Sequence, residues 1–494
     1  MNRQSVRERV EQVYAVGVEA VVELVLRLLE EFAGQVSDVA TRMAVLESEN
    51  AALRARLGTD SHNSSKPPPS DGPGSTPHPK SQRVVSGRKS GGQPGHAGHT
   101  LRLVEDPDEV AVHGPAHCRA CGEDLAGVPA VRHERRQVVD IPPIQVRVIE
   151  HRVETKCCPG CGMETSGAFP ADVTAPVQYG PRVATLGVYL NQEQLLPLER
   201  TCAVLDEVCG CPISEGTLER AVAACHEQLA ETEAAIKRGI EQAAVAHFDE
   251  TGLQIGDRMA WLHVASTASL TFYASHPKRG RAAMEEIGVL PAFRGRAMHD
   301  GLASYWQFEQ CQHALCNAHH LRELTFIEEQ LGQLWATDLK ALLGEMKRTV
   351  DRARTQGLLA LPAETQQVFA QRYATILATG FRANPLPERT GKRGRPKRGK
   401  ARNLLERLRE HQEPTLAFLA DFAVPFDNNQ AERDIRMTKV RQKISGCFRT
   451  ATGAERFCRI RGYISTLRKQ GILIFSALGQ AITGLPLLPA TAGP

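Results

Sequence analysis

The sequence predicts a multidomain α+β protein. Three observations lead to this fold class: an N-terminal segment with heptad spacing, two cysteine pairs around a β-like stretch, and short apolar runs that alternate with helical patterns further on. The chain has 494 residues, of which 42% are apolar. At roughly 100–200 residues per domain, this length predicts about three domains with linkers. The apolar content excludes a chain that is disordered throughout.

Residues 1–58 are predicted to form a coiled-coil oligomerisation helix, and residues 59–104 a linker. Two sets of mostly apolar residues, each with a spacing of seven, would form the contact seam of the coiled coil. One set is Leu29, Val36, Met43, Asn50 and Leu57, and the other is Val25, Phe32, Val39, Leu46 and Leu53. A lone asparagine on such a seam is typical of two-stranded coiled coils. An amphipathic helix packed on its own domain would have the same spacing. The linker is rich in Pro, Gly and Ser and cannot bury a core.

Residues 105–170 contain two C-x-x-C-G knuckles. The glycine of each knuckle allows a tight turn whose backbone N–H groups point at the thiolate sulfurs. Four thiolates suit a structural zinc ion with ligands at about 2.3 Å, and a closed site of this kind performs no chemistry. The predicted zinc ligands are Cys118, Cys121, Cys158 and Cys161.

Other features of this segment leave alternatives open. Cys157 could replace Cys158 with a poorer spacing, and further candidate ligands are His113, His117 and His133. A redox role would need a CxxC pair in a thioredoxin-like setting, which the sequence lacks. Alternating apolar residues over 133–155 predict short strands, so we expect a small zinc-binding β unit.

Residues 171–243 are predicted to be helical. A helix over Glu199–Val208, a turn over Cys209–Pro212 and a helix opened by Ser214 have the spacing of a helix–turn–helix motif. The region is therefore a candidate for DNA binding. Two packed helices without a DNA role would give the same pattern.

A mixed α/β sheet is predicted from residue 244 onward. The expected strands cover residues 244–249, 261–266, 270–275, 296–300 and 312–316, with a helix over 281–287. This first part of the region extends to residue 328. The remaining divisions are residues 329–415, which are mostly helical around a basic loop, residues 416–470, which contain a basic helix, and a C-terminal tail over 471–494.

Three acidic residues stand out by their positions. Asp249 and Asp300 each end an apolar run, and Glu432 opens the basic helix. Carboxylates at the ends of neighbouring strands meet at one edge of a sheet, and a helix across that edge can add a third. Such hard oxygen ligands suit Mg²⁺ or Mn²⁺. Two of these ions can activate a nucleophile and stabilise the leaving oxygen of a phosphodiester.

Each acidic residue also has a purely structural explanation. Aspartates at strand ends often form turns, and Glu432 could pair with Arg436 one helical turn later. Glu250 follows Asp249 and must face the opposite side of the strand. The spacing alone does not decide which of these two residues points into the site.

The charge distribution predicts a polyanionic partner. The net charge is only +4, but residues 380–410 hold 11 basic and 3 acidic residues, and residues 433–469 hold 11 basic and 2 acidic residues. Arg393 and Arg395 belong to an RGRP segment that could enter a narrow DNA minor groove, or contact phosphates from a solvated loop. The predicted phosphate contacts beside Glu432 are Arg433, Arg436, Lys439, Arg441 and Lys443.

The sequence shows no sign of secretion or of membrane insertion. Thirteen cysteines in a long chain favour a reducing compartment, and the N-terminal residues lack a signal-peptide pattern. No uninterrupted apolar run of about 18 residues occurs. We therefore expect a cytoplasmic, nucleoid-associated protein.

Several motifs, taken in order, resemble the transposases of the insertion-sequence-66 family, and the resemblance covers almost the whole chain. The motifs are Asn63-Ser64-Ser65-Lys66-Pro67-Pro68 after the coiled coil, the two cysteine knuckles, His247-Phe248-Asp249-Glu250-Thr251, His299-Asp300-Gly301, Cys316-Asn317-Ala318-His319, Lys400-Ala401-Arg402-Asn403 and Asp427-Asn428-Asn429-Gln430-Ala431-Glu432-Arg433. One departure is Asn317, where the family commonly has Trp.

This resemblance implies a DDE transposase with a ribonuclease H-like catalytic core and a helical insertion before the catalytic glutamate. Asp249, Asp300 and Glu432 match the catalytic triad and would bind two Mg²⁺ or Mn²⁺ ions. The implied reaction cleaves DNA at terminal inverted repeats with water, after which the freed 3′-hydroxyl attacks target DNA.

The partners implied by the resemblance are the terminal inverted repeats, the target DNA and accessory proteins encoded by the same element. The predicted coiled coil adds a second copy of the chain as a partner. Two alternative functions remain open at this point. One is a metal-dependent nuclease of the same fold, and the other is a non-enzymatic, zinc-containing DNA-binding regulator.

Overall fold

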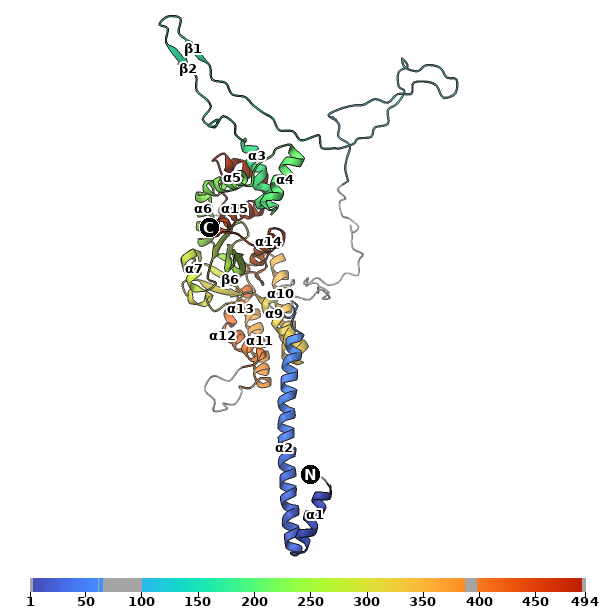
Figure 1. Cartoon of the computed structure of the whole chain (residues 1–494), viewed down its shortest axis with the longest axis vertical. Helices are drawn as coiled ribbons and strands as arrows, with labels where there is room; N and C mark the ends of the chain where they lie inside the picture. The colour runs from blue at the N-terminus through green and yellow to red at the C-terminus, as the bar shows by residue number, and fades with distance from the viewer. Residues whose placement is uncertain (1–2, 61, 65–99, 387–397, 491–494) are drawn as a thin grey trace.

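The computed structural model describes residues 3–60, 62–64, 100–386 and 398–490. Two helices open the chain, α1 (Arg3–Tyr14) and α2 (Val18–Leu57), and the turn between them contains Gly17 with φ of 130°. Helix α2 extends far from the body of the molecule, with α1 folded back at its tip (Figure 1).

Helix α2 carries the predicted seam on an exposed surface. Its large apolar side chains are exposed along the length of the helix, including Leu29, Phe32, Val36, Val39 and Leu46. The helix predicted over residues 1–58 is divided at Gly17 into α1 and α2, and no segment within the described residues covers the apolar side of α2. Assembly with a second copy stays a prediction.

The C-terminal end of α2 is anchored on the body of the protein. Asn63 is buried, its Nδ2 donates to the Gly58 carbonyl at 2.7 Å, and its Oδ1 accepts from the Asp60 N–H at 3.0 Å. His62 lies 3.5 Å from a carboxylate oxygen of Glu329, on α9 (Asn317–Leu331). The predicted linker therefore begins with an ordered turn, and most of its remaining residues lie outside the described ranges.

The cysteine-rich segment contains little regular structure. Strands β1 (Thr155–Cys157) and β2 (Glu164–Ser166) pair antiparallel around the second knuckle. The further strands predicted over 133–155 do not form, and Val138, Ile141 and Val148 are exposed. Alternation of apolar residues makes a stable strand only where a neighbouring strand and a packed face exist, and the described residues provide neither here.

Helices α3 to α6 cover one end of the body. They are α3 (Pro181–Val188), a π-helical turn η2 (Tyr189–Glu193), α4 (Leu198–Cys209), α5 (Glu215–Gln228) and α6 (Ala230–Glu241). Gly210 ends α4 with φ of 58°, and the Ser214 hydroxyl caps α5 by accepting the Thr217 N–H at 3.1 Å. The predicted helix, turn and second helix are confirmed as structure, while their contact with DNA stays a prediction.

Five strands form one mixed sheet in the order β5-β4-β3-β6-β7. They are β3 (Val245–Ile255), β4 (Arg258–Ser266), β5 (Thr271–His276), β6 (Arg296–His299) and β7 (Gln312–Leu315). The pairs β3–β4 and β4–β5 are antiparallel, while β3–β6 and β6–β7 are parallel. One expectation was wrong in detail: Asp249 lies inside β3, because pairing with β4 continues to Ile255 after the apolar run stops.

Helices cover both faces of this sheet. On one face, α6, α7 (Arg281–Ile287) and α8 (Val289–Ala292) bury Phe248 and Phe272. On the other face, α14 (Asn429–Ser445) and α15 (Ala451–Lys469) pack on β4 and β5 through Ile435 and Tyr273, among others. The two faces of β3 are therefore distinct environments, and alternate residues enter one or the other.

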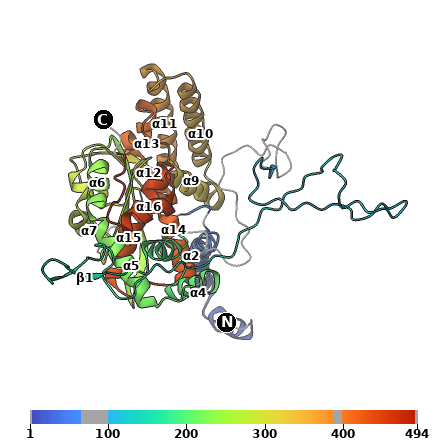
Figure 2. The same cartoon turned by 90° about the horizontal axis from the view of Figure 1, so that it is seen from above.

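The helices between β7 and α14 form a bundle with their own core. They are α9, α10 (Leu334–Thr355), α11 (Ala363–Ala383), α12 (Lys400–Glu410) and α13 (Gln412–Ala420). Their core continues into the sheet through Met298 and Ala314. The bundle and helices α3 to α5 lie at opposite ends of the body (Figures 1 and 2).

The segment predicted as a C-terminal tail contains helix α16 (Ile474–Ile482), which is part of the fold. Ala477, Leu478 and Ala481 of α16 are buried in a cluster with residues of α3, α5 and α15. Nearby, Glu193 and Arg461 form an ion pair that is almost completely buried. The described part of the chain contains no candidate for a membrane-spanning helix.

Candidate active site

The parallel pairing of β3 and β6 brings Asp249 and Asp300 to the same region. His247 is opposite Met298 in the last pair of this ladder. Asp249 and Asp300 each follow two residues later, so alternation puts both on the face covered by α14. The Asp249 Oδ1 accepts the Glu250 N–H at 2.8 Å, and the Asp300 Oδ1 accepts the Leu302 N–H at 2.9 Å.

The environment of Asp249 opposes its negative charge. Burial raises the pKa of Asp249 well above its usual value, and the nearby charges of Glu250, Asp300 and Glu432 raise it further. A cation held between these carboxylates would remove the repulsion. The chemistry of the donor set therefore fits a divalent cation that prefers oxygen ligands.

Glu250 is held on the opposite side of β3. Its side chain is fully buried, its Oε1 lies 2.8 Å from Arg279, and its Oε2 accepts the Tyr305 hydroxyl at 2.6 Å. Arg279 in turn lies over the Trp261 ring, 4.8 Å from its centroid. These contacts satisfy Glu250 within the fold and leave Asp249 as the residue of this pair on the α14 face.

Asn428 fixes the start of α14 against the sheet. Its Nδ2 donates to the Phe248 carbonyl at 2.9 Å, and its Oδ1 accepts from His247 Nδ1 at 2.8 Å. Its backbone N–H donates to the Cys316 Sγ at 3.1 Å. Because Glu432 lies one helical turn further on, Asn428 determines where this third carboxylate can reach.

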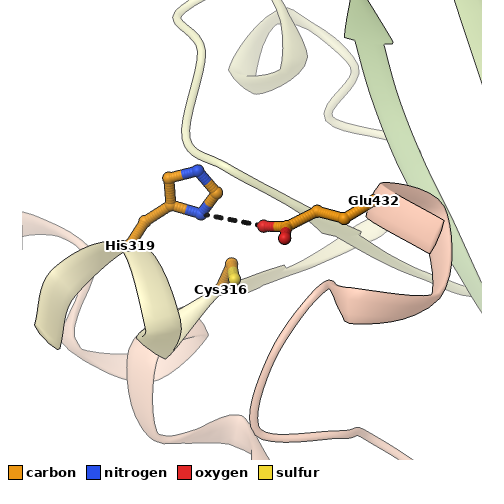
Figure 3. A group of neighbouring side chains, drawn as sticks. All are labelled: Cys316, His319 and Glu432. Carbon is orange, nitrogen blue, oxygen red and sulfur yellow. Dashed lines mark ion pairs between the residues drawn. The ribbon is translucent and has the colours of Figure 1, made fainter. Parts of the chain in front are cut away.

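Glu432 contacts residues of α9 in this structure. Its Oε1 lies 3.1 Å from the Arg322 guanidinium and 3.9 Å from His319 Nδ1 (Figure 3). Among the described residues, Glu432, Cys316 and His319 are the group whose possible ligand atoms all lie within 4.8 Å of one another. The structure does not bring Asp249, Asp300 and Glu432 to that separation, although Glu432 is close enough to raise the pKa of Asp249.

The basic residues of α14 differ in their exposure. Arg433 and Arg436 are exposed, and Arg433 donates to the Gln430 side chain at 2.9 Å. Lys439 donates to the Gly252 carbonyl at 3.1 Å, and Arg441 lies 3.6 Å from the centroid of the Phe448 ring. Burial lowers the pKa of both Lys439 and Arg441, that of Arg441 to about 10. Arg393 and Arg395 lie outside the described residues.

Each cysteine knuckle has formed as a turn. The Gly122 N–H donates to the Cys118 carbonyl at 2.9 Å, and the Gly162 N–H donates to the Cys158 carbonyl at 2.8 Å. Backbone N–H groups directed at the sulfurs lower the pKa of Cys118 and Cys158, which favours thiolates and so fits zinc. Within the described ranges, however, the two knuckles do not come together as one group of ligands.

Two residues of the site have contacts that the sequence does not indicate. Arg322 pairs with Glu432 across 110 positions, and nothing local to either residue indicates the contact. Asn428 belongs to the Asp427–Arg433 motif, but its role is visible only through its bonds to His247 and Phe248. Asn317, which replaces the expected Trp, is buried and donates to the Thr415 carbonyl at 3.0 Å.

Comparison with known protein families identifies the class of protein that this fold and site belong to. Residues 176–456 match the family described as Transposase IS66 family, and residues 115–162 match the zinc-finger binding domain of transposase IS66. Residues 18–102 match DUF6444, a family of unknown function. No curated protein matches the chain.

The chain is a transposase. More particularly, it belongs to the IS66 family of transposases, because the family match covers more than half of its 494 residues. Membership implies an enzyme of the polynucleotidyl transferase kind that binds DNA and uses a divalent metal, and the second match implies zinc. The second match spans all four cysteines of the two knuckles.

Proposed function

We propose that this transposase cleaves DNA at the terminal inverted repeats of its element and joins the freed ends to target DNA. Asp249, Asp300 and Glu432 are the proposed catalytic residues. The observation that carries this proposal is the parallel pairing of β3 and β6, which brings Asp249 and Asp300 to the same region beside α14, and the raised pKa of Asp249 supports it. Acidic groups clustered in this way are typical of metal-binding catalytic sites.

The order of the strands supports a ribonuclease H-like core. Three antiparallel strands are followed by two parallel strands, and a helix carrying the third acid packs against the sheet. The helical bundle α9 to α13 enters between β7 and α14 and corresponds to the insertion implied by the family resemblance.

Mg²⁺ or Mn²⁺ ions held by the three carboxylates would lower the pKa of a nucleophile and stabilise the leaving oxygen. For Glu432 to join the other two acids, its carboxylate has to leave Arg322. A DNA phosphate is a suitable replacement partner for Arg322, since the guanidinium binds phosphate oxygens as well as carboxylates. Arg322 would then hold a phosphate close to the three acids.

Exposed cations beside the site would bind the DNA backbone. Arg433 and Arg436 share the exposed side of α14 with Lys443, and their contacts would position phosphates without reading sequence. Lys439 and Arg441 instead support the packing of α14, and we assign them no direct DNA contact. Helices α4 and α5 and the zinc unit are the proposed readers of the terminal repeats.

Two copies of the chain would pair through the exposed seam of α2. A two-stranded coiled coil would cover the apolar side chains that the described residues leave open to solvent. Such a dimer would bring two active sites to the two ends of one element.

The proposed function is tested with Asp300→Asn in a Mg²⁺-dependent assay on DNA that carries the element ends. We expect this variant to bind the ends but to yield neither cleaved nor joined product. The matched control is Asp257→Asn, because Asp257 is exposed in the turn between β3 and β4. Cleavage at the wild-type rate by Asp300→Asn would contradict the assignment. Cleavage by the wild-type chain without joined product would indicate a nuclease instead.

A further inference from the structure

We propose that Cys316, His319 and Glu432 form a binding site for a transition-metal ion, with Zn²⁺ as the best match. Their sulfur, ring nitrogen and carboxylate oxygen all lie within 4.8 Å of one another. Figure 3 shows the three side chains directed toward a common point from the start of α9 and the first turn of α14. This site is distinct from the three-carboxylate site and shares only Glu432 with it.

Hydrogen bonds of the backbone fix the segments that carry the three ligands. The Cys316 N–H donates to the His299 carbonyl at 3.0 Å, and the Asn317 N–H donates to the Phe426 carbonyl at 3.1 Å. The Cys316 Sγ accepts the Asn428 N–H at 3.1 Å. Backbone donors of this kind stabilise metal-bound thiolates and orient the sulfur. The starts of α9 and α14 are therefore fixed relative to each other before any ion arrives.

The separations suit a tetrahedral ion. With bonds of about 2.0–2.3 Å, tetrahedral zinc ligands lie roughly 3.3–3.7 Å apart. His319 Nδ1 and Glu432 Oε1 are 3.9 Å apart, and no two of the three ligand atoms are more than 4.8 Å apart, so the side chains have to draw slightly closer together to bind the ion. Three protein ligands leave a fourth position for water, as in open zinc sites.

The donor set discriminates between metals. A thiolate and an imidazole favour Zn²⁺ over Mg²⁺, which prefers oxygen ligands and six-coordinate geometry. Cys316 is buried, with 1% of its surface exposed, so its thiol is not placed to react with large molecules in solution. His319 and Glu432 are partly exposed and leave an approach for a small ion.

Arg322 competes with this metal ion for Glu432. Its guanidinium lies 3.1 Å from the same oxygen that faces His319, so the ion has to displace it. Removal of Arg322 should therefore tighten metal binding by about two- to fivefold, the range expected for one partly exposed ion pair.

A metal ion at this site would hold Glu432 away from Asp249 and Asp300. In this respect the inference rests on the proposed function: bound Zn²⁺ would suppress Mg²⁺-dependent cleavage by keeping the third carboxylate occupied. Binding itself does not depend on that function and is measured separately.

The test measures zinc per chain after the full-length protein is equilibrated with Zn²⁺ and desalted. Cys316→Ser and His319→Ala are each expected to bind one equivalent fewer than the wild-type chain, whatever the cysteine knuckles hold. Cys458→Ser is the matched control, because Cys458 is also buried but lies on α15 in the cluster packed against β4 and β5. When both proteins are titrated with Co²⁺, the sulfur-to-cobalt charge-transfer band should be more intense in the wild-type chain than in Cys316→Ser.

Equal zinc content in the wild-type chain and in both variants would overturn the site. If Cys316→Ser does not fold, the zinc content of His319→Ala still tests the site. His319 is partly exposed, so its replacement is expected to disturb the fold less than that of Cys316. Asp300→Asn should keep the full zinc content while losing cleavage. Its activity and its zinc content therefore report separately on the proposed function and on this site.

Discussion

Replacing Asn428 with alanine is expected to loosen the start of α14 from the sheet. The change removes two buried hydrogen bonds, to the Phe248 carbonyl at 2.9 Å and to His247 Nδ1 at 2.8 Å. Both partners stay buried and lose their bond, which costs roughly 1–2 kcal/mol each. The local free energy of opening should therefore fall by about 2–4 kcal/mol.

Hydrogen exchange measured by mass spectrometry gives this local quantity. Amides in the first turns of α14 and in β3 near Phe248 should exchange roughly 30- to 700-fold faster than in the wild-type chain. The control is Asn429→Ala, which alters the adjacent, exposed asparagine. If the two variants exchange alike in these segments, Asn428 does not position the helix that carries Glu432. Cleavage should also fall in Asn428→Ala and not in the control.

Three further predictions address the acidic site, the knuckles and the long helix. The raised pKa of Asp249 lets the folded chain keep a proton that the unfolded chain loses above about pH 4, so this group lowers stability as the pH rises toward the folded pKa. Asp249→Asn should therefore raise the urea midpoint of the metal-free chain at pH 7, with no difference below about pH 4; a lower midpoint at pH 7 would refute this. Cys121→Ser should lose one equivalent of zinc while Cys157→Ser keeps it, and equal losses would favour Cys157 as a ligand. Leu46→Glu should convert oligomers to monomers in light scattering without unfolding the chain, since Leu46 is exposed, and Glu47→Gln should not.

The sheet could be predicted from sequence because its strands have strong local patterns. Four of the five strands of the sheet lie close to the expected ranges, and the helix over 281–287 has the predicted bounds. The end of β3 was mispredicted because the apolar run stops before Asp249, whereas pairing with β4 continues to Ile255 and buries Leu253 in a separate cluster. A strand can continue wherever a neighbouring strand forms hydrogen bonds with it, and the pattern of apolar residues along the sequence does not reveal such a neighbour.

The positions of the acids were predictable, but their partners were not. Alternation puts Asp249 and Glu250 on opposite faces, and only the contacts of Glu250 with Arg279 and Tyr305 decide which one faces α14. The contact between Arg322 and Glu432 likewise depends on how α9 packs beside α14. The seam of α2 and the pairs of cysteines were recognisable from spacing, while the exposed residues 138–148 show that alternation alone does not make a sheet.

The cluster that joins α3 and α5 to α15 and α16 also constrains how the protein is made. On the ribosome, α3 to α6 emerge well before the helices that complete their core, because about 210 residues separate the end of α6 from the start of α15. At roughly 5–20 residues per second, these helices wait about 10–40 s with apolar surface exposed. A chain that is released from the ribosome before α16 is made would contain every proposed catalytic residue. It would lack the buried residues that α16 contributes to this core. Helix α16 is therefore expected to be needed for stable folding, and a chain that stops before α16 should be prone to aggregation.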